Sequence, residues 1–92
     1  MTRVLIVDDD VTIRNLIADA LREVGYEVDT AANGIDALQR MRRQPPAAVV
    51  LDLMMPRMDG MTFTRLVRLN PRLAQVPVIM VTATYASQVE AA

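Results

Sequence analysis

The chain contains no cysteine, no histidine and no lysine, and each absence removes a class of function. Without cysteine there is no disulfide framework and no thiolate metal site, which is consistent with a reducing compartment such as the cytoplasm. Without histidine there is no imidazole general base, no phosphohistidine and no histidine-ligated metal. Chemistry carried by these 92 residues must use carboxylates, hydroxyl groups and the backbone.

Long apolar runs and a strong net charge are also missing. The first apolar run, residues 4–7, ends at an aspartate and is too short for a signal sequence or a membrane span. The formal net charge is -1, so the composition lacks the basic character that nucleic-acid phosphates demand. We expect one cytoplasmic domain with a modest core that binds neither membranes nor nucleic acid directly.

Four short segments are predicted to be strands. Residues 4–7, 47–51 and 77–81 are continuous apolar runs, which is the pattern of strands buried on both faces of a sheet. Residues 27–31 alternate between polar and apolar side chains, as expected for a strand nearer the edge.

The segments between these strands have helical periodicity. One helix begins at Val11 and can end at Gly25, a second covers residues 35–43, and a third follows Gly60. Strands that alternate with helices indicate an α/β fold, with a parallel sheet covered by helices on both faces. The side chains predicted to face the core are Ile13, Leu16, Ile17, Ala20, Leu21 and Val24 in the first helix, and Phe63, Leu66, Val67 and Leu69 in the third.

Polar side chains follow three of the predicted strands. They are Asp8-Asp9-Asp10, then Asp52, then Thr82. Ligands of an open parallel sheet bind beyond the carboxyl ends of its strands, so these groups converge if the strands are neighbours. Crowded carboxylates either have raised pKa values or bind a hard cation such as Mg²⁺ or Mn²⁺. Such a cation can neutralise charge during phosphoryl transfer, and an aspartate can be the nucleophile.

Three motifs, taken in order, resemble the receiver domains of two-component response regulators. They are Leu5-Ile6-Val7-Asp8-Asp9-Asp10, Asp52-Leu53-Met54-Met55-Pro56-Arg57-Met58-Asp59-Gly60 and Val78-Ile79-Met80-Val81-Thr82-Ala83. The resemblance covers residues 1–92 and implies a flavodoxin-like, doubly wound parallel sheet. It also implies a signalling role without enzymatic turnover, in which Asp52 accepts a phosphoryl group from a histidine kinase or a phosphotransfer protein.

The resemblance implies a metal site as well. Asp8 and Asp9 would bind Mg²⁺ together with Asp52 and the backbone carbonyl of Met54. Asp9 would be the more direct ligand, and Asp10 would be a neighbour outside the ligand set.

Further implied residues surround the phosphoryl group. Thr82 would donate a hydrogen bond to a phosphoryl oxygen, and the small Ala83 would leave room for that group. Pro56 and Gly60 would shape the loop after Asp52, and the side chains of Met54 and Thr84 would influence how water reaches the phosphoaspartate. Because Met54 cannot orient water, we expect slow self-hydrolysis.

Two features of the family are not found in these residues. Similar proteins have a lysine on the strand after Thr82 that contacts the phosphoryl group, and a switch aromatic near it. Loss of such a charge-assisted contact is worth about 1.5–3 kcal/mol, so phosphorylation is expected to be impaired or uncoupled. We interpret the chain as a C-terminally shortened receiver domain of about four strands, without the last strand and helix. The exposed edge of residues 77–81 then favours a homodimer, including one with exchanged elements.

Two other functions stay open. Asp8-Asp9-Asp10-Val11-Thr12 also fits the nucleophile motif of haloacid dehalogenase-type phosphatases, with Asp8 as nucleophile, but Asp52 to Gly60 has no place in that family. The second alternative is a receiver-like interaction module that dimerises and is not phosphorylated.

Several other motifs are explained by structure alone. Asn33-Gly34 is predicted to be a turn, and Asp59-Gly60 is predicted to be structural. The arginines near the end of the second helix are expected to form a solvated face: Arg40, Arg42 and Arg43.

Overall fold

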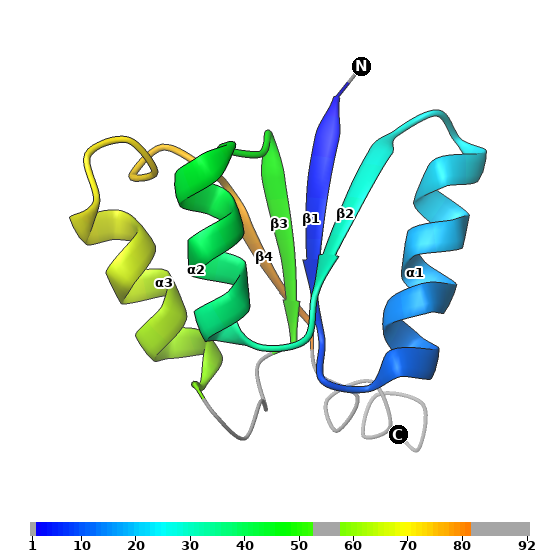
Figure 1. Ribbon diagram of the computed structural model, residues 1–92, viewed down its shortest axis with the longest axis horizontal. Coiled ribbons are helices and arrows are strands. Elements are labelled where there is room, and N and C mark those ends of the chain that lie inside the picture. The colour runs from blue at the N-terminus through cyan, green and yellow to red at the C-terminus, as the bar shows by residue number, and fades with distance from the viewer. Residues whose placement is uncertain (1, 53–57, 82–92) are drawn as a thin grey trace, which may run out of the picture.

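Four parallel strands form the sheet at the centre of this computed structural model, which describes residues 2–52 and 58–81 (Figure 1). The strands are β1 (Arg3–Val7), β2 (Glu27–Ala31), β3 (Ala48–Asp52) and β4 (Val78–Val81). Their order is β2-β1-β3-β4, so the chain reverses direction across the sheet after β2. This order confirms the flavodoxin-like arrangement over the described strands and creates a switch point between β1 and β3.

Three helices connect the strands and lie on both faces of the sheet. They are α1 (Val11–Glu23), α2 (Gly34–Arg43) and α3 (Gly60–Leu69). Figure 1 shows α1 on one face and α2 with α3 on the other. Each helix begins after a side chain that caps its free N–H groups, and these caps are Asp10, Asn33 and Asp59. Within the described ranges no helix has the length and apolar character that crossing a bilayer requires.

The main core lies between the sheet and the pair α2 and α3. Alternate strand residues point to this face, because successive side chains of a strand alternate between the two faces. The strand side chains are joined there by Phe63 and Val67 of α3, both 0% exposed. The other members of this buried cluster are Leu5, Val7, Ala31, Ala37, Leu38, Met41, Val49, Leu51, Leu73 and Val76.

The predicted inward faces of α1 and α3 are partly wrong. Leu16 and Val24 of α1 are 70% and 71% exposed, and Ile13 is 38% exposed, whereas Ala18 is buried. The reason is that α1 packs mainly on β1 and β2, so a narrow line of residues is covered and the rest of the apolar arc faces outward. Leu66 and Leu69 of α3 are likewise exposed.

For β4 the apolar run predicted burial on both faces, which is wrong, whereas the expected exposed edge agrees with the described strands. Ile79 is 54% exposed and Val81 is 47% exposed. Within the described residues β4 pairs with β3 on one side and forms the edge of the sheet on the other. A continuous apolar run indicates a strand but does not say how many neighbours cover it.

Arg40 was predicted to lie on a solvated face, but it takes part in an ion-pair network that joins β1, β2 and α2. Its Nη1 lies 2.9 Å from Asp29 Oδ1, and its Nε lies 3.1 Å from Asp36 Oδ1. Arg3 Nη2 contacts the other oxygen of Asp29 at 2.9 Å. Asp29 is therefore held between two guanidinium groups from different elements.

The beginning of α2 packs closely against the segment that precedes α3. A methyl group placed on Gly34 would lie 2.9 Å from the sulfur and 3.1 Å from Cβ of Met58. Met58 in turn packs against the buried core cluster. Glycine at position 34 lets these two segments touch.

Candidate functional site

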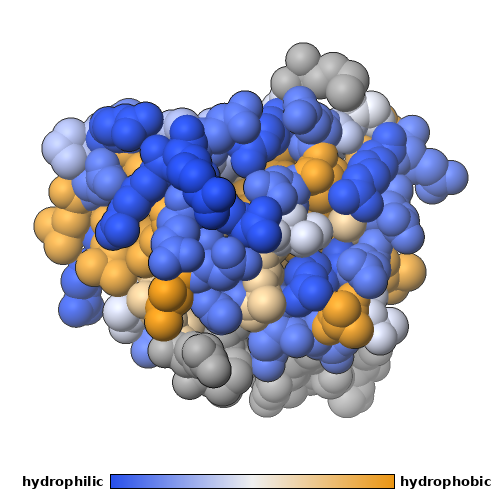
Figure 2. Space-filling model, in the orientation of Figure 1, coloured by the Kyte–Doolittle hydropathy of each residue, from blue (hydrophilic) through white to orange (hydrophobic). Residues whose placement is uncertain are grey.

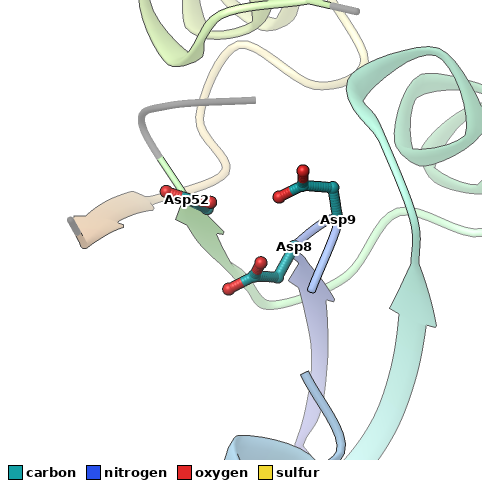
Figure 3. A group of neighbouring side chains, drawn as sticks. All are labelled: Asp8, Asp9 and Asp52. Carbon is teal, nitrogen blue, oxygen red and sulfur yellow. The ribbon is translucent and has the colours of Figure 1, made fainter. Parts of the chain in front are cut away.

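An acidic cluster forms where β1 and β3 end. Val7 is paired with Leu51 in the parallel register, so Asp8 and Asp52, the residues that follow, are brought side by side. One carboxylate oxygen from each of Asp8, Asp9 and Asp52 lies within 4.8 Å of the others. Figure 3 shows the three side chains gathered around the space between the two strand ends. The sequence prediction that these carboxylates converge is therefore supported by the sheet order.

Asp8 is the most enclosed member of the cluster. Its residue is 6% exposed, and its Oδ1 accepts a hydrogen bond from the backbone N–H of Asp10 at 2.9 Å. Burial raises the pKa of the Asp8 carboxyl above its ordinary value, and the charges of Asp52, Asp9 and Asp10 add to this rise, while the Asp10 N–H opposes it. Metal-free Asp8 thus resists ionisation in the folded chain.

The Asp10 side chain caps the start of helix α1. Its Oδ1 accepts hydrogen bonds from the backbone N–H groups of Thr12 at 2.9 Å and Ile13 at 3.1 Å. This N-cap turns the carboxylate toward the first turn of α1, and the carboxylate cluster consists of Asp8, Asp9 and Asp52. Asp10 therefore lies next to the carboxylate cluster and is not one of its members.

Replacing the Asp10 cap tests this division of roles. Asp10→Ala is expected to lower the free energy of unfolding by about 1 kcal/mol, because the Thr12 and Ile13 N–H groups lose their acceptor. Asp10→Ser retains a hydrogen-bond acceptor, so its free energy of unfolding should fall by only a few tenths of that amount. Urea unfolding of both variants measures the difference, and equal losses for Ala and Ser would contradict the cap.

The cluster fits a single hard cation. Asp8 is buried, Asp52 is half-buried and Asp9 is exposed, so the site has a fixed inner side and an open outer side. Ligands on opposite sides of an octahedral Mg²⁺ lie about 4.2 Å apart. One carboxylate oxygen from each of the three residues lies within 4.8 Å of the others, so the cluster is compact enough to surround one ion. Mg²⁺ commonly uses a small number of carboxylates and completes its shell with water, which the open side allows.

An apolar cavity lies directly beneath the carboxylates on the face that carries α1. Its volume is about 340 Å³. Two side chains of α1, Ile13 and Ile17, and two of the sheet, Val50 and Val81, contribute to its lining, together with the acidic cluster. The carboxylates therefore form the polar rim of an otherwise apolar hollow.

Other predicted site residues are less fully placed. Gly60 is the first residue of α3, and Asp59 caps that helix, which confirms the structural interpretation of this pair. Hydrogen bonds from the backbone and side chain of Thr62 lower the pKa of the Asp59 carboxyl. The remaining predicted residues lie outside the described residues: Met54, Pro56, Thr82, Ala83 and Thr84.

Arg14 also contributes to the site, and the sequence analysis missed it. Its Nη1 donates a hydrogen bond to the Asp8 carbonyl at 2.9 Å and so ties the start of α1 to the end of β1. No motif in the sequence marks this contact, because an arginine one turn into a helix is usually a solvated residue.

Comparison with known proteins agrees with this geometry. Residues 4–92 match the sequence family described as the response regulator receiver domain. The chain is 43% identical over 81 residues to a "Probable transcriptional regulator ycf27" of Pyropia yezoensis, covering 88% of this chain and 32% of that protein. It is 42% identical over 82 residues to a "Probable chemotaxis protein CheY" of Rhizobium etli, covering 88% of this chain and 64% of that protein.

Comparison with solved structures agrees with the sequence relatives. The fold superimposes on the chemotaxis protein CheY4 of Vibrio cholerae with a TM-score of 0.84 and 32% identity, covering 99% of this chain and 79% of that one. The chain spans about a third of the length of the first of the two sequence relatives and just under two thirds of the second. Family match, sheet order and acidic cluster agree, and the chain belongs to the response regulator receiver domain family.

Proposed function

We propose that this receiver domain takes a phosphoryl group onto Asp52 from a histidine kinase or a phosphotransfer protein, in a reaction that requires Mg²⁺. The observation that carries the proposal is the placement of Asp52 at the end of β3, beside Asp8 and Asp9 at the switch point of the sheet. Phosphorylation would then change which partners the domain binds.

Among the three carboxylates, Asp52 is the best suited to be the nucleophile. Asp8 is buried, and one of its oxygens already accepts the Asp10 N–H, so it has little freedom to approach a donor. Asp52 is half-buried at the end of a strand, which combines a fixed position with access from outside. The same contrast argues against a phosphatase in which Asp8 would be the nucleophile.

The transfer forms one bond and breaks one bond. A carboxylate oxygen of Asp52 bonds to phosphorus as the bond from phosphorus to the donor imidazole nitrogen breaks, and its electron pair stays on the imidazole, which takes up a proton. A cation bound by Asp8, Asp9 and Asp52 supplies charge neutralisation for the phosphoryl oxygens. Met54, through its carbonyl, and Thr82 with Ala83 are proposed to complete the site.

Two side chains are proposed to set the rate at which the phosphoaspartate is hydrolysed. Met54 and Thr84 are proposed to control water access, with slow hydrolysis of the phosphoaspartate because Met54 cannot orient water.

Intact-mass measurement with acetyl phosphate tests the proposal. The protein with Mg²⁺ is expected to gain one phosphoryl group, and omission of Mg²⁺ or the change Asp52→Asn should abolish the gain. Asp19→Asn removes an exposed carboxylate of α1 and should leave the gain intact. Unmodified wild-type protein, or modification that survives Asp52→Asn, would contradict Asp52 as the acceptor.

The exposed edge of β4 supports a second candidate function, a dimerising interaction module. Ile79, Met80 and Val81 are exposed, and an uncharged apolar edge strand readily pairs with another chain. Sedimentation analysis distinguishes the two functions. A stable dimer combined with no modification by acetyl phosphate would favour the interaction module.

A further inference from the structure

Six of the ten arginines lie where β1 and β4 begin and where α2 and α3 end, at the edge of the sheet opposite the acidic cluster. We call this surface the arginine edge. In Figure 1 it is the upper edge, and Figure 2, in the same orientation, shows strongly hydrophilic side chains across the upper part of the molecule over α2. Its arginines come from the start of β1, the last turns of α2 and α3, and the turn before β4: Arg3, Arg40, Arg42, Arg43, Arg68 and Arg72.

Hydrogen bonds hold these arginines together around the end of α2. Arg72 Nη1 donates to the carbonyl of Arg42 at 3.3 Å, and Arg3 Nη1 donates to the carbonyl of Gln44 at 3.0 Å. A groove of about 200 Å³ lies among them. Its lining consists entirely of polar residues: Arg3, Asp29, Arg40, Arg43 and Gln44.

The arginine edge has an excess of unneutralised positive charge. Arg3 and Arg40 neutralise Asp29 and Asp36, and Glu27 is the other carboxylate at the start of β2. Arg42 and Arg43 are exposed and form no ion pair with any residue in the ranges that the structure describes. Their guanidinium groups remain available, and such groups match phosphate oxygens in planar, bidentate geometry.

The formal net charge of -1 does not reveal that positive charge gathers at one edge of the sheet and negative charge at the other. Strands of five residues separate the arginine edge from the acidic cluster, a distance of about 17 Å at 3.3 Å per residue. The Debye length at physiological ionic strength is about 8 Å, so each edge presents its own charge to a partner. The expectation that the domain avoids nucleic acid was based on the total charge and did not consider its distribution.

We propose that the arginine edge binds the phosphate backbone of a nucleic-acid duplex, with Arg42, Arg43 and Arg72 as the principal contacts. A duplex presents a dense and rigid row of phosphates, so contacts to phosphates alone, without contacts to bases, are sufficient for binding. Protein partners usually need an apolar or aromatic anchor at the centre of the interface, and the all-polar groove offers none. The chemistry therefore favours a duplex over an acidic peptide.

Fluorescence anisotropy with a labelled DNA duplex tests the proposal. Three phosphate contacts predict a slope of log K against log salt of about -2.7, and hence about 40-fold weaker binding at 200 mM than at 50 mM salt. Arg42→Gln/Arg43→Gln should lower the magnitude of the slope by about 2 and weaken binding at 50 mM salt by at least about tenfold.

A matched control separates a localised surface from general charge. Arg22→Gln/Arg65→Gln makes the same change in net charge at two arginines outside this group. Arg22 lies in the last turn of α1, on the other face of the sheet, and pairs with Asp19, and Arg65 lies near Asp59. This variant should bind the duplex like the wild type. Equal weakening by both double variants, no binding at 50 mM salt, or tighter binding to polyglutamate than to the duplex would each overturn the proposal.

Discussion

Asp8→Asn is expected to stabilise the metal-free protein at neutral pH and to remove its stabilisation by Mg²⁺. Asp8 is buried beside Asp9 and Asp52, so its ionised form loses hydration and meets like charges. Asparagine keeps an oxygen that can accept the Asp10 N–H but carries no charge. The variant therefore keeps the hydrogen bond, relieves the repulsion and removes one of the carboxylates proposed to bind the cation.

The pH dependence has a definite sign. The pKa of Asp8 is raised in the folded chain above its ordinary value of 3.8, so the folded state binds the proton more readily than the unfolded state. Stability without metal should fall as the pH rises from about the ordinary value through the raised value, and it should level off above that range. This contribution to the pH dependence should disappear in Asp8→Asn.

Urea unfolding with and without Mg²⁺ measures both effects. At a Mg²⁺ concentration 100-fold above Kd, the free energy of unfolding of the wild type should rise by about 2.7 kcal/mol. That of Asp8→Asn should rise little. Asp19→Asn, at an exposed position of α1, should respond to Mg²⁺ like the wild type. An undiminished response of Asp8→Asn to Mg²⁺ would remove Asp8 from the ligand set.

Phe63→Ala is expected to lower the free energy of unfolding by about 3–5 kcal/mol. Phe63 is 0% exposed and is among the largest fully buried side chains described, so its removal leaves a cavity between α3 and the sheet. A domain of this size is stabilised by roughly 5–14 kcal/mol, and the loss would be a large share of that total.

Met61→Ala is the matched control for this change. Met61 lies two residues away on the same helix and is 61% exposed, so its truncation should change stability by about 0.5 kcal/mol at most. The urea midpoints of the two variants should differ clearly. Similar midpoints would mean that α3 does not present Phe63 to the core as described.

The bounds of the strands and helices could be predicted closely, because local pattern determines them. β2 covers the predicted residues 27–31, and α1 begins at Val11 as predicted. The errors concern burial, because packing against a neighbouring element determines which apolar side chains of a helix are covered. Leu16 is apolar and lies on the predicted face of α1, yet it is exposed because α1 packs mainly on β1 and β2.

The candidate site could likewise be predicted only in part. The sequence identified Asp8, Asp9 and Asp52 as strand-end carboxylates, but the order of the strands, which brings them together, is a property of the fold. The contact of Arg14 with the Asp8 carbonyl has no sequence signature. The clustering of arginines opposite the acids was equally hidden, because residues far apart in the chain meet at that edge.

The contact between Gly34 and Met58 restricts how this sequence can vary. A side chain at position 34 would enter space that Met58 occupies, so the two positions cannot enlarge independently. A larger residue at 34 requires a smaller or displaced one at 58, and Met58 lies in the segment between Asp52 and α3. Substitutions at these two positions are therefore expected to occur in compensating pairs among related sequences, although Gly34 lies outside the acidic cluster.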